Sequence, residues 1–181
     1  MSVHLYPFTC IAGSGSYGRL GNLESTDQLF LDPVELLAGE IVKQIAGGNS
    51  FTLALTNDGV VHGFGRNDKG NESTDAIWRI FLLFSSACLP CDSTVSFHVL
   101  PRHAGQLGTG GGMMVDMYAM SSLPTPIEGQ LENRTVAKIG TGHSHSACIT
   151  NRGELFIWGM NRYLEPELVT SLLHTKVSFF P

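Results

Sequence analysis

Apolar and polar residues alternate in short runs along most of the chain, and a glycine-containing turn closes each run. Phe51 to Thr56 alternates, Asn57-Asp58-Gly59 supplies a turn, and Val60 to Phe64 returns. A side-chain period of two is typical of β-strands, so this stretch predicts a β-hairpin. The stretch 146–158 has the same layout around Asn151-Arg152-Gly153. Strands, not helices, are therefore expected in both regions.

The two hairpins are copies of one repeat. Residues 42–67 lie over residues 136–161 at an offset of 94 without a gap, and nine of the 26 aligned positions are identical. Three of the shared positions are glycines, at Gly48/Gly142, Gly59/Gly153 and Gly65/Gly159. Glycines that keep their register indicate a repeated turn geometry and not a chance match of composition.

A third sign of the repeat stands near the start of the chain. Gly13, Gly18, Leu20 and Gly21 have the spacing G-x4-G-x-L-G. Gly65 and Gly70 begin the same pattern, but its remainder, Gln106-Leu107-Gly108, follows only after an interruption over residues 71–105. Without these 35 residues the offset between the later copies falls from 94 to 59. Repeats of about 50 to 60 residues have the size of one propeller blade.

Composition and charge narrow the class of protein to which the chain can belong. The chain has 181 residues, of which 43% are hydrophobic and 15% charged, and its formal net charge is −5. These values predict a globular domain. The chain lacks the excess of lysine and arginine that indicates binding to nucleic acid or anionic lipid. The longest apolar stretch, 77–87, is too short for a spanning helix, so no membrane segment is expected.

Four cysteines are too few for a disulfide scaffold, and the first 14 residues do not resemble a signal peptide. We therefore expect an intracellular protein, either cytoplasmic or nuclear. Cys88-x-x-Cys91 lacks the second pair that a zinc site needs, and His143-x-His145 lacks carboxylate or thiolate neighbours. No catalytic residue, metal ligand or cofactor is assigned.

Gly13 to Gly18 fits the dinucleotide fingerprint G-x-G-x-x-G after an apolar strand. That fingerprint needs a helix to follow, and Arg19 to Leu23 shows no amphipathic helical run. A dinucleotide-binding enzyme built on these glycines therefore stays a minor alternative to a repeat turn.

The recurring stretches resemble the repeat of the regulator of chromosome condensation family, whose blades end in the pattern W-G-x-N-x-x-G-Q-L-G. Trp158-Gly159-Met160-Asn161 matches its beginning, and Phe64 to Gly70 joins Gln106-Leu107-Gly108 across the interruption. The last copy departs from the pattern, because Asn161 to Pro166 lacks G-Q-L-G. The repeat signature comprises Gly13, Gly18, Gly21, Gly48, Gly59, Gly65, Gly70, Gly108, Gly142, Gly153, Trp158 and Gly159.

The resemblance implies a β-propeller of about seven four-stranded blades, and closure would need roughly twice the length present. We therefore expect an all-β fold, a partial propeller of about two and a half to three blades of antiparallel strands. Its parts are a first repeat segment over 1–70, a disordered or irregular insertion over 71–105 and a second repeat segment over 106–181. Phe8 to Ala12 and Val177 to Phe180 resemble strands of neighbouring repeats. An open arc of this kind exposes apolar faces and strand edges.

Two origins of the interruption stand open. It is either an evolved loop insertion or a translated intron, and we favour the intron because its removal restores Gly-Gln-Leu-Gly without a change of frame. The genetic code allows a GT splice donor within the Gly70 codon and an AG splice acceptor that spans the codons of Ala104 and Gly105.

The family resemblance implies two classes of function. One is guanine-nucleotide exchange on a Ran-type small GTPase, often with attachment to chromatin, and the other is a platform that binds proteins. A fold does not choose between them. We expect first a non-enzymatic protein–protein interaction module with a protein partner, and exchange-factor activity as the alternative. Chromatin enters by analogy only.

Overall fold

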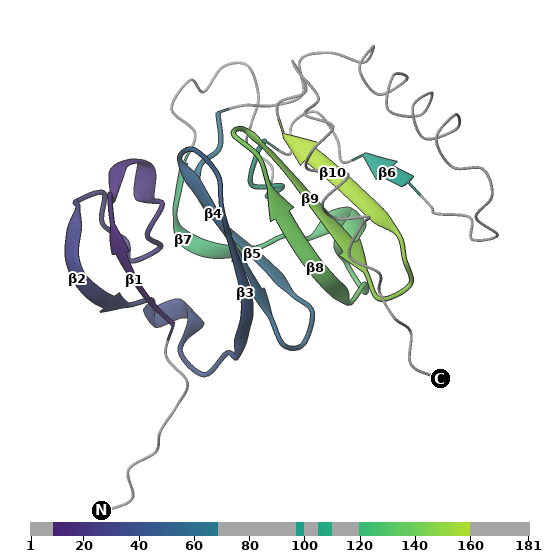
Figure 1. Ribbon diagram of the computed structural model, residues 1–181, viewed down its shortest axis with the longest axis horizontal. Coiled ribbons are helices and arrows are strands. Elements are labelled where there is room, and N and C mark those ends of the chain that lie inside the picture. Colours follow the sequence, from purple (N-terminus) through teal and green to yellow (C-terminus); the bar gives the residue numbers. More distant parts are fainter. Residues whose placement is uncertain (1–8, 69–96, 100–104, 110–119, 160–181) are drawn as a thin grey trace, which may run out of the picture.

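The computed structural model describes residues 9–68, 97–99, 105–109 and 120–159 (Figure 1). Their regular structure is β-strand apart from three single-turn 3₁₀ helices, which confirms the predicted all-β class. No helix in these ranges is long and apolar enough to cross a membrane. The strands are β1 (Cys10–Gly13), β2 (Gln28–Pro33), β3 (Val42–Gly47), β4 (Phe51–Thr56), β5 (Val61–Arg66), β6 (Phe97–Val99), β7 (Met120–Pro126), β8 (Val136–Thr141), β9 (His145–Thr150) and β10 (Leu155–Gly159). The 3₁₀ helices are η1 (Ser16–Gly18), η2 (Glu35–Leu37) and η4 (Gly129–Leu131).

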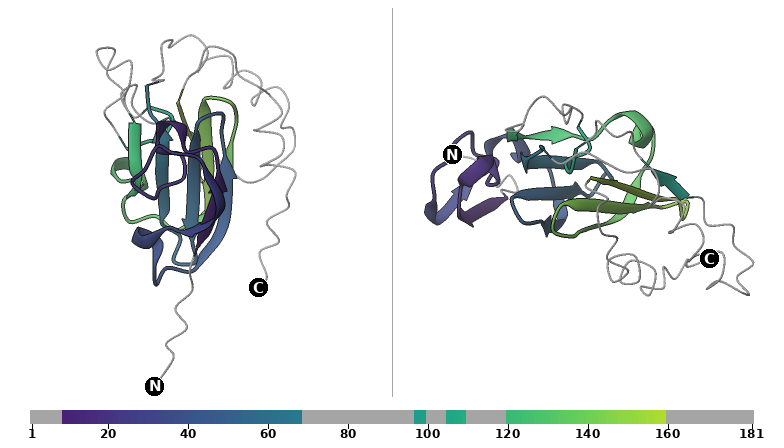
Figure 2. Two further views of the ribbon diagram at one scale, coloured as in Figure 1. Left: turned by 90° about the vertical axis from the view of Figure 1, so that its left-hand side faces the viewer. Right: turned by 90° about the horizontal axis from the view of Figure 1, so that it is seen from above.

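The strands form three sheets that follow one another along the long axis of the molecule (Figure 2). The first sheet has the order β1-β2, the second β3-β4-β5-β7 and the third β8-β9-β10-β6, written from its β8 edge. Both predicted hairpins are present as β4-β5 and β9-β10. The arrangement is an arc of propeller blades, as the family resemblance implied.

The first sheet is the outer half of a blade. β1 corresponds to β5 at the offset of 52 residues that separates Gly13 from Gly65. One hydrogen bond recurs in the two sheets, because Val34 N donates to Thr9 O at 2.9 Å and Ile127 N donates to Val61 O at 2.8 Å. The sequence predicted that Phe8 to Ala12 resembles the last strand of a blade. Cys10 to Ala12 do lie in such a strand, β1, whereas Phe8 lies outside the described residues.

The third sheet contains a strand that the sequence pattern did not predict. β6 lies within the interruption and pairs with β10 in parallel, with Phe97 opposite Leu155 and Val99 opposite Ile157. In the second sheet the corresponding outer strand, β7, is antiparallel to β5. The β6–β10 pair is thus a local departure from the antiparallel pattern, and the three residues of β6 are too few to show a period in the sequence.

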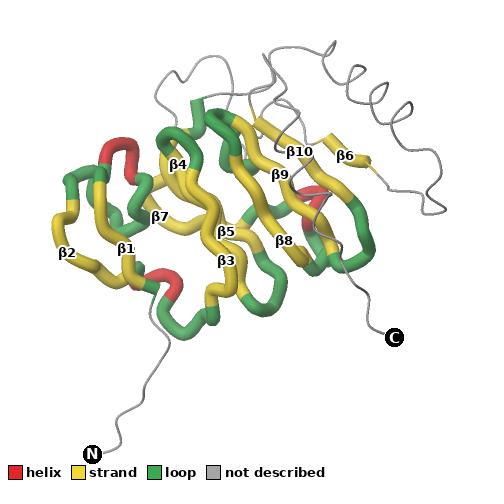
Figure 3. The backbone as a smooth tube through the Cα atoms, viewed as in Figure 1, coloured by secondary structure: helices red, strands yellow, loops and turns green. Residues whose placement is uncertain are grey.

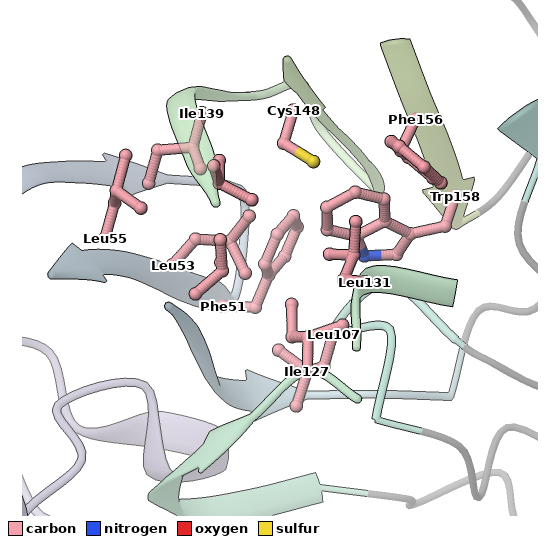
Figure 4. Packing of buried hydrophobic residues seen from close by; sticks show 12 residues of the cluster. Phe51, Leu53, Leu55, Leu107, Ile127, Leu131, Ile139, Cys148, Phe156 and Trp158 are labelled. Atoms are coloured by element: carbon pink, nitrogen blue, oxygen red, sulfur yellow. The ribbon is translucent and has the colours of Figure 1, made fainter. Parts of the chain in front are cut away.

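The main hydrophobic core lies between the second and third sheets (Figure 4). Phe51, Leu53 and Leu55 project from β4, and Ile139 and Trp158 come from the third sheet. All five side chains are at most 3% exposed. Because the apolar surface of each sheet is buried against its neighbour, the two blades stabilise each other.

A loop glycine of one blade contacts an aromatic ring of the next, and this contact occurs twice. A Cβ atom on Gly108 would lie 2.9 Å from Trp158 Nε1, and one on Gly21 would lie 2.9 Å from Phe64 Cδ2. Both glycines also have positive φ, +78° and +72°. Any side chain at these positions would therefore meet both a steric and a backbone obstacle.

A hydrogen bond accompanies each of these contacts. Ser146 Oγ donates to Gln106 O at 2.8 Å, and at the equivalent positions Thr52 Oγ1 donates to Arg19 O at 2.9 Å. Trp158 Nε1 adds a second donor to Gln106 O at 3.0 Å. The loop of one blade is thus held by the second strand of the next through buried or partly buried polar groups.

The residues on the two sides of the interruption meet in space. Leu107 N donates to Asn67 Oδ1 at 3.0 Å, and Gln106 Nε2 donates to Asp68 Oδ1 at 3.3 Å. Gly105, the last residue assigned to the interruption, has a φ of +64° and lies beside Asn67. The repeat loop is therefore assembled from both sides, whereas Gly70 lies outside the described residues.

Replacement of Gly108 tests the glycine–aromatic contact. We expect Gly108→Ala to lower the free energy of unfolding by about 2–4 kcal/mol, because the new methyl group overlaps Trp158 and the backbone is strained. Gly153 is the matched control, since its φ is +80° and a Cβ there meets no heavy atom within 4 Å. Gly153→Ala should cost only about 1 kcal/mol. Urea denaturation followed by tryptophan fluorescence measures both, and equal losses would contradict the packing argument.

Candidate functional site

One end of the three sheets carries the turns 14–22, 48–50, 66–68 and 142–144, which we call the loop face (Figure 3). These turns come from all three blades and lie along the upper edge of the molecule in the view of Figure 1. Loops held by a rigid sheet scaffold are the usual position of binding residues in β proteins. The loop face is therefore the first candidate for a functional surface.

Backbone carbonyls connect the turns of the loop face from blade to blade. Arg19 Nη1 donates to Asn49 O at 3.1 Å, which joins the first blade to the second. Asn49 N donates to His143 O at 3.1 Å, which joins the second blade to the third. Asn49 and His143 occupy equivalent repeat positions, so this bond joins two copies of the same turn. The turns form one continuous ridge.

Tyr17 is the most unusual residue of this ridge. Its φ of +64° lies in the left-handed region, and its side chain is 37% exposed. Such a conformation costs on the order of 1–3 kcal/mol in a residue with a side chain, and it persists where the surroundings fix it. Arg66 supplies such a contact, since its guanidinium carbon lies 4.8 Å from the centre of the Tyr17 ring.

Arg66 is itself held in place by Asp68. Its Nε donates to Asp68 Oδ1 at 2.7 Å and its Nη2 donates to Asp68 Oδ2 at 2.6 Å. The hydrogen bonds to Asp68 raise the pKa of Arg66, so the guanidinium stays charged beneath the aromatic ring. Tyrosine and arginine are, with tryptophan, the side chains enriched among the residues that contribute most to affinity at protein interfaces. Sequence reasoning missed this pair because Tyr17 stood inside a glycine motif that the repeat already explained.

The described repeat-signature residues lie in turns, at blade contacts and near the ends of strands. Trp158 is buried at 3% exposure in the main core, and Cβ atoms on Gly48 and Gly142 would overlap the rings of Phe51 and His145. The remaining described signature glycines have positive φ: Gly13, Gly18, Gly21, Gly59, Gly65, Gly108, Gly153 and Gly159.

The dinucleotide alternative lacks its structural requirement. Gly13 to Gly18 ends in the three-residue η1, and the chain then continues through turns into β2 without an α-helix. A pyrophosphate therefore has no helix N-terminus to approach at this loop.

Metal and thiol candidates give no assembled site in the described part of the chain. No group of three His, Cys, Asp or Glu residues lies close enough together there to hold a metal ion. His143 lies in a turn and His145 begins β9, where its ring packs beside Gly142. Cys88 and Cys91 lie outside the described residues.

An apolar surface stands apart from the loop face, on β2, which pairs with β1 alone among the described strands. Leu29, Phe30 and Leu31 of β2 are 88%, 84% and 74% exposed. Three consecutive exposed apolar side chains on an edge strand are rare in globular proteins. An open arc was expected to expose apolar faces of this kind.

Cys148 provides a test of core burial. Desolvation raises the pKa of its thiol from the ordinary 9.0 to about 12. At pH 8 only about one thiol in ten thousand would be ionised at such a pKa. In a variant that retains only Cys148, we expect labelling by Ellman's reagent to require unfolding.

A variant that retains only the exposed Cys10 is the control and should react at once. Because burial favours the protonated thiol, the contribution of Cys148 to stability is complete below pH 9 and declines as the pH rises toward 12. Native-state labelling of Cys148 as fast as that of Cys10 would contradict its burial.

Three features define the chain as a partial β-propeller repeat protein. They are the arc of three sheets, the repeat with the size of one blade and the joined turns of the loop face. Residues 42–71 and 136–164 each match the regulator of chromosome condensation (RCC1) repeat. The two matches begin 94 residues apart, which confirms the repeat offset found in the sequence. The chain therefore carries repeats of the RCC1 family.

Curated proteins with different activities are similar to this chain. The E3 ubiquitin-protein ligase HERC2 of Homo sapiens is 30% identical over 190 residues, which cover 92% of this chain and 4% of the ligase. The secretion-regulating guanine nucleotide exchange factor of Bos taurus is 28% identical over 171 residues, which cover 84% of this chain and 37% of that protein. The chain thus spans less than two fifths of either relative.

A solved structure shares the fold. Prp20p from Saccharomyces cerevisiae, whose crystal structure was described together with its binding properties to Gsp1p and histones, is similar with a TM-score of 0.53 at 17% identity. The similarity covers 84% of this chain and 29% of Prp20p. At this level of identity the comparison establishes the blade architecture.

Proposed function

We propose that the chain is a non-enzymatic protein–protein interaction module that binds through its loop face. The observation that carries the proposal is the ridge of turns joined through Arg19, Asn49 and His143. Turns fixed before binding lose little conformational freedom when a partner arrives, so more of the contact energy becomes affinity. Tyr17 on Arg66 supplies a rigid amphipathic anchor on that ridge.

The relatives support a binding role for the repeats. A ubiquitin ligase and a nucleotide exchange factor share similar segments although their named activities differ. A repeat common to proteins of different activity is more consistent with recognition than with one conserved reaction. We propose an intracellular protein partner, met in the cytoplasm or the nucleus.

Replacement of Tyr17 tests the loop face. We expect Tyr17→Ala to reduce the amount of partner protein retained by the immobilised chain at least about tenfold, as truncation of an interface anchor does. Arg152→Ala is the matched control, because Arg152 is an exposed residue of the β9–β10 turn at the opposite end of the blade. Quantitative mass spectrometry of proteins captured from a cell extract compares the two variants with the unaltered chain.

Capture that depends on Tyr17 and not on Arg152 is the expected result, with circular dichroism confirming that both variants fold. An identical set of captured proteins from all three chains would contradict binding through the loop face.

Exchange-factor activity on a Ran-type small GTPase is the second candidate. It is supported by the similarity to the secretion-regulating guanine nucleotide exchange factor and by the shared fold with Prp20p, whose described binding partners are Gsp1p and histones. Release of a fluorescent GDP analogue from Gsp1p measures this activity directly. Release accelerated by the chain supports exchange, whereas binding without acceleration supports the interaction module alone.

A further inference from the structure

A cavity of about 410 Å³ opens at the end of the molecule opposite the loop face. It lies between the β4–β5 turn, η4 with the end of β7, and the segment that leads into β8. It is thus formed by the second blade, the third blade and the connection between them. Neither the repeat signature nor the proposed function uses this cavity.

The inner wall of the cavity is apolar. Val61, Ile127, Leu131 and Val136 line it and are at most 5% exposed, whereas Val60 lines it at 43% exposure. The backbone groups of this wall are already engaged, since Ile127 N donates to Val61 O and Val136 N donates to Gly59 O. Because the four buried side chains expose little surface, Val60 is the main apolar side chain that the wall offers to an occupant.

Two carboxylates, Glu128 and Glu132, also line the cavity and are exposed. Within the described residues neither side chain has an ion pair. Asp58, exposed and next to the lining residue Gly59, adds a third negative charge to this region. The cavity thus combines an apolar wall with an acidic margin.

Arg134, the cation of the lining, is not available to neutralise that margin. Its Nε lies 3.2 Å from Glu154 Oε2, and its Nη1 donates to Gln130 O at 2.5 Å. Its guanidinium carbon also lies 5.2 Å from the centre of the Phe156 ring. Its charge is balanced by Glu154.

Two further cations lie near the lining, since Lys43 Nζ donates to Val136 O at 3.3 Å and Arg152 follows Asn151, whose N donates to Thr135 O at 2.9 Å. The exposed carboxylates Asp58, Glu128 and Glu132 outnumber these two cations.

We propose that this cavity binds a basic segment of a partner protein, one that places a large apolar side chain on the inner wall beside a lysine or arginine. The apolar wall would exclude water from the aliphatic part of the segment, and the carboxylates would meet its positive charge. This surface lies at the other end of the sheets from the loop face. The proposal therefore stands whether or not the loop face binds a protein.

Fluorescence anisotropy with a labelled peptide of alternating lysine and leucine tests the proposal on the full 181-residue chain. A peptide of alternating glutamate and leucine and a peptide of lysine alone are the comparison probes. We expect saturable binding of the lysine–leucine peptide that weakens as salt is added, and at least about fivefold weaker binding of either comparison probe.

Charge-removing variants locate the binding. Glu128→Gln combined with Glu132→Gln should weaken binding of the lysine–leucine peptide about five- to tenfold. Glu35→Gln is the matched control, because Glu35 holds the repeat position equivalent to Glu128 after the prolines Pro33 and Pro126 and does not line the cavity. Val60→Ser tests the apolar contact and should weaken binding several-fold.

Three results would overturn the proposal. They are the absence of saturable binding, an equal effect of the Glu35 control and the paired glutamate variant, and equal binding of lysine alone, which would mean unspecific attraction to an acidic protein. Circular dichroism at each step verifies that the variants fold. Tyr17→Ala should leave this binding unchanged, which separates its outcome from that of the loop face.

Discussion

The close approach of a loop glycine to the aromatic ring of the next blade is the constraint on which the rest of the structure depends. Gly21 against Phe64 and Gly108 against Trp158 set how near one blade stands to the next. Only a residue without Cβ allows that distance, and only the same residue accepts the backbone conformation of the loop. Two of the 21 glycines of the chain are therefore fixed by the described blade boundaries.

This spacing explains the polar positions inside otherwise apolar strands. Thr52 and Ser146 interrupt the apolar runs of β4 and β9, and both donate to a backbone carbonyl of the preceding loop. A buried carbonyl without a donor would cost free energy, so the hydroxyl belongs to the blade boundary as much as the ring does. Gln44 makes a further bond of this kind, since its side-chain amide both donates to Ile139 O and accepts from Ile139 N.

The hairpins could be predicted because apolar and polar residues alternate locally with a period of two. The repeat and its blade-sized period could be predicted because the glycines keep their spacing. β6 could not, since three residues give no period and its partner β10 lies more than 50 residues further along. The pair of Tyr17 and Arg66 and the bond of Asn49 to His143 likewise depend on distant segments and on backbone acceptors. For the hydroxyls of Thr52 and Ser146 a signal did exist, because they occupy equivalent positions at the repeat offset.

The meeting of Asn67 with Leu107 and of Asp68 with Gln106 has a consequence for how this fold can change in length. Hydrogen bonds hold the two ends of this loop together, and the entropy cost of a longer loop grows only with the logarithm of its length. Residues can thus be added or removed between Asp68 and Gly105 while the geometry of the blade stays the same. A protein engineer who wished to graft a reporter domain onto this scaffold would find its natural attachment point there.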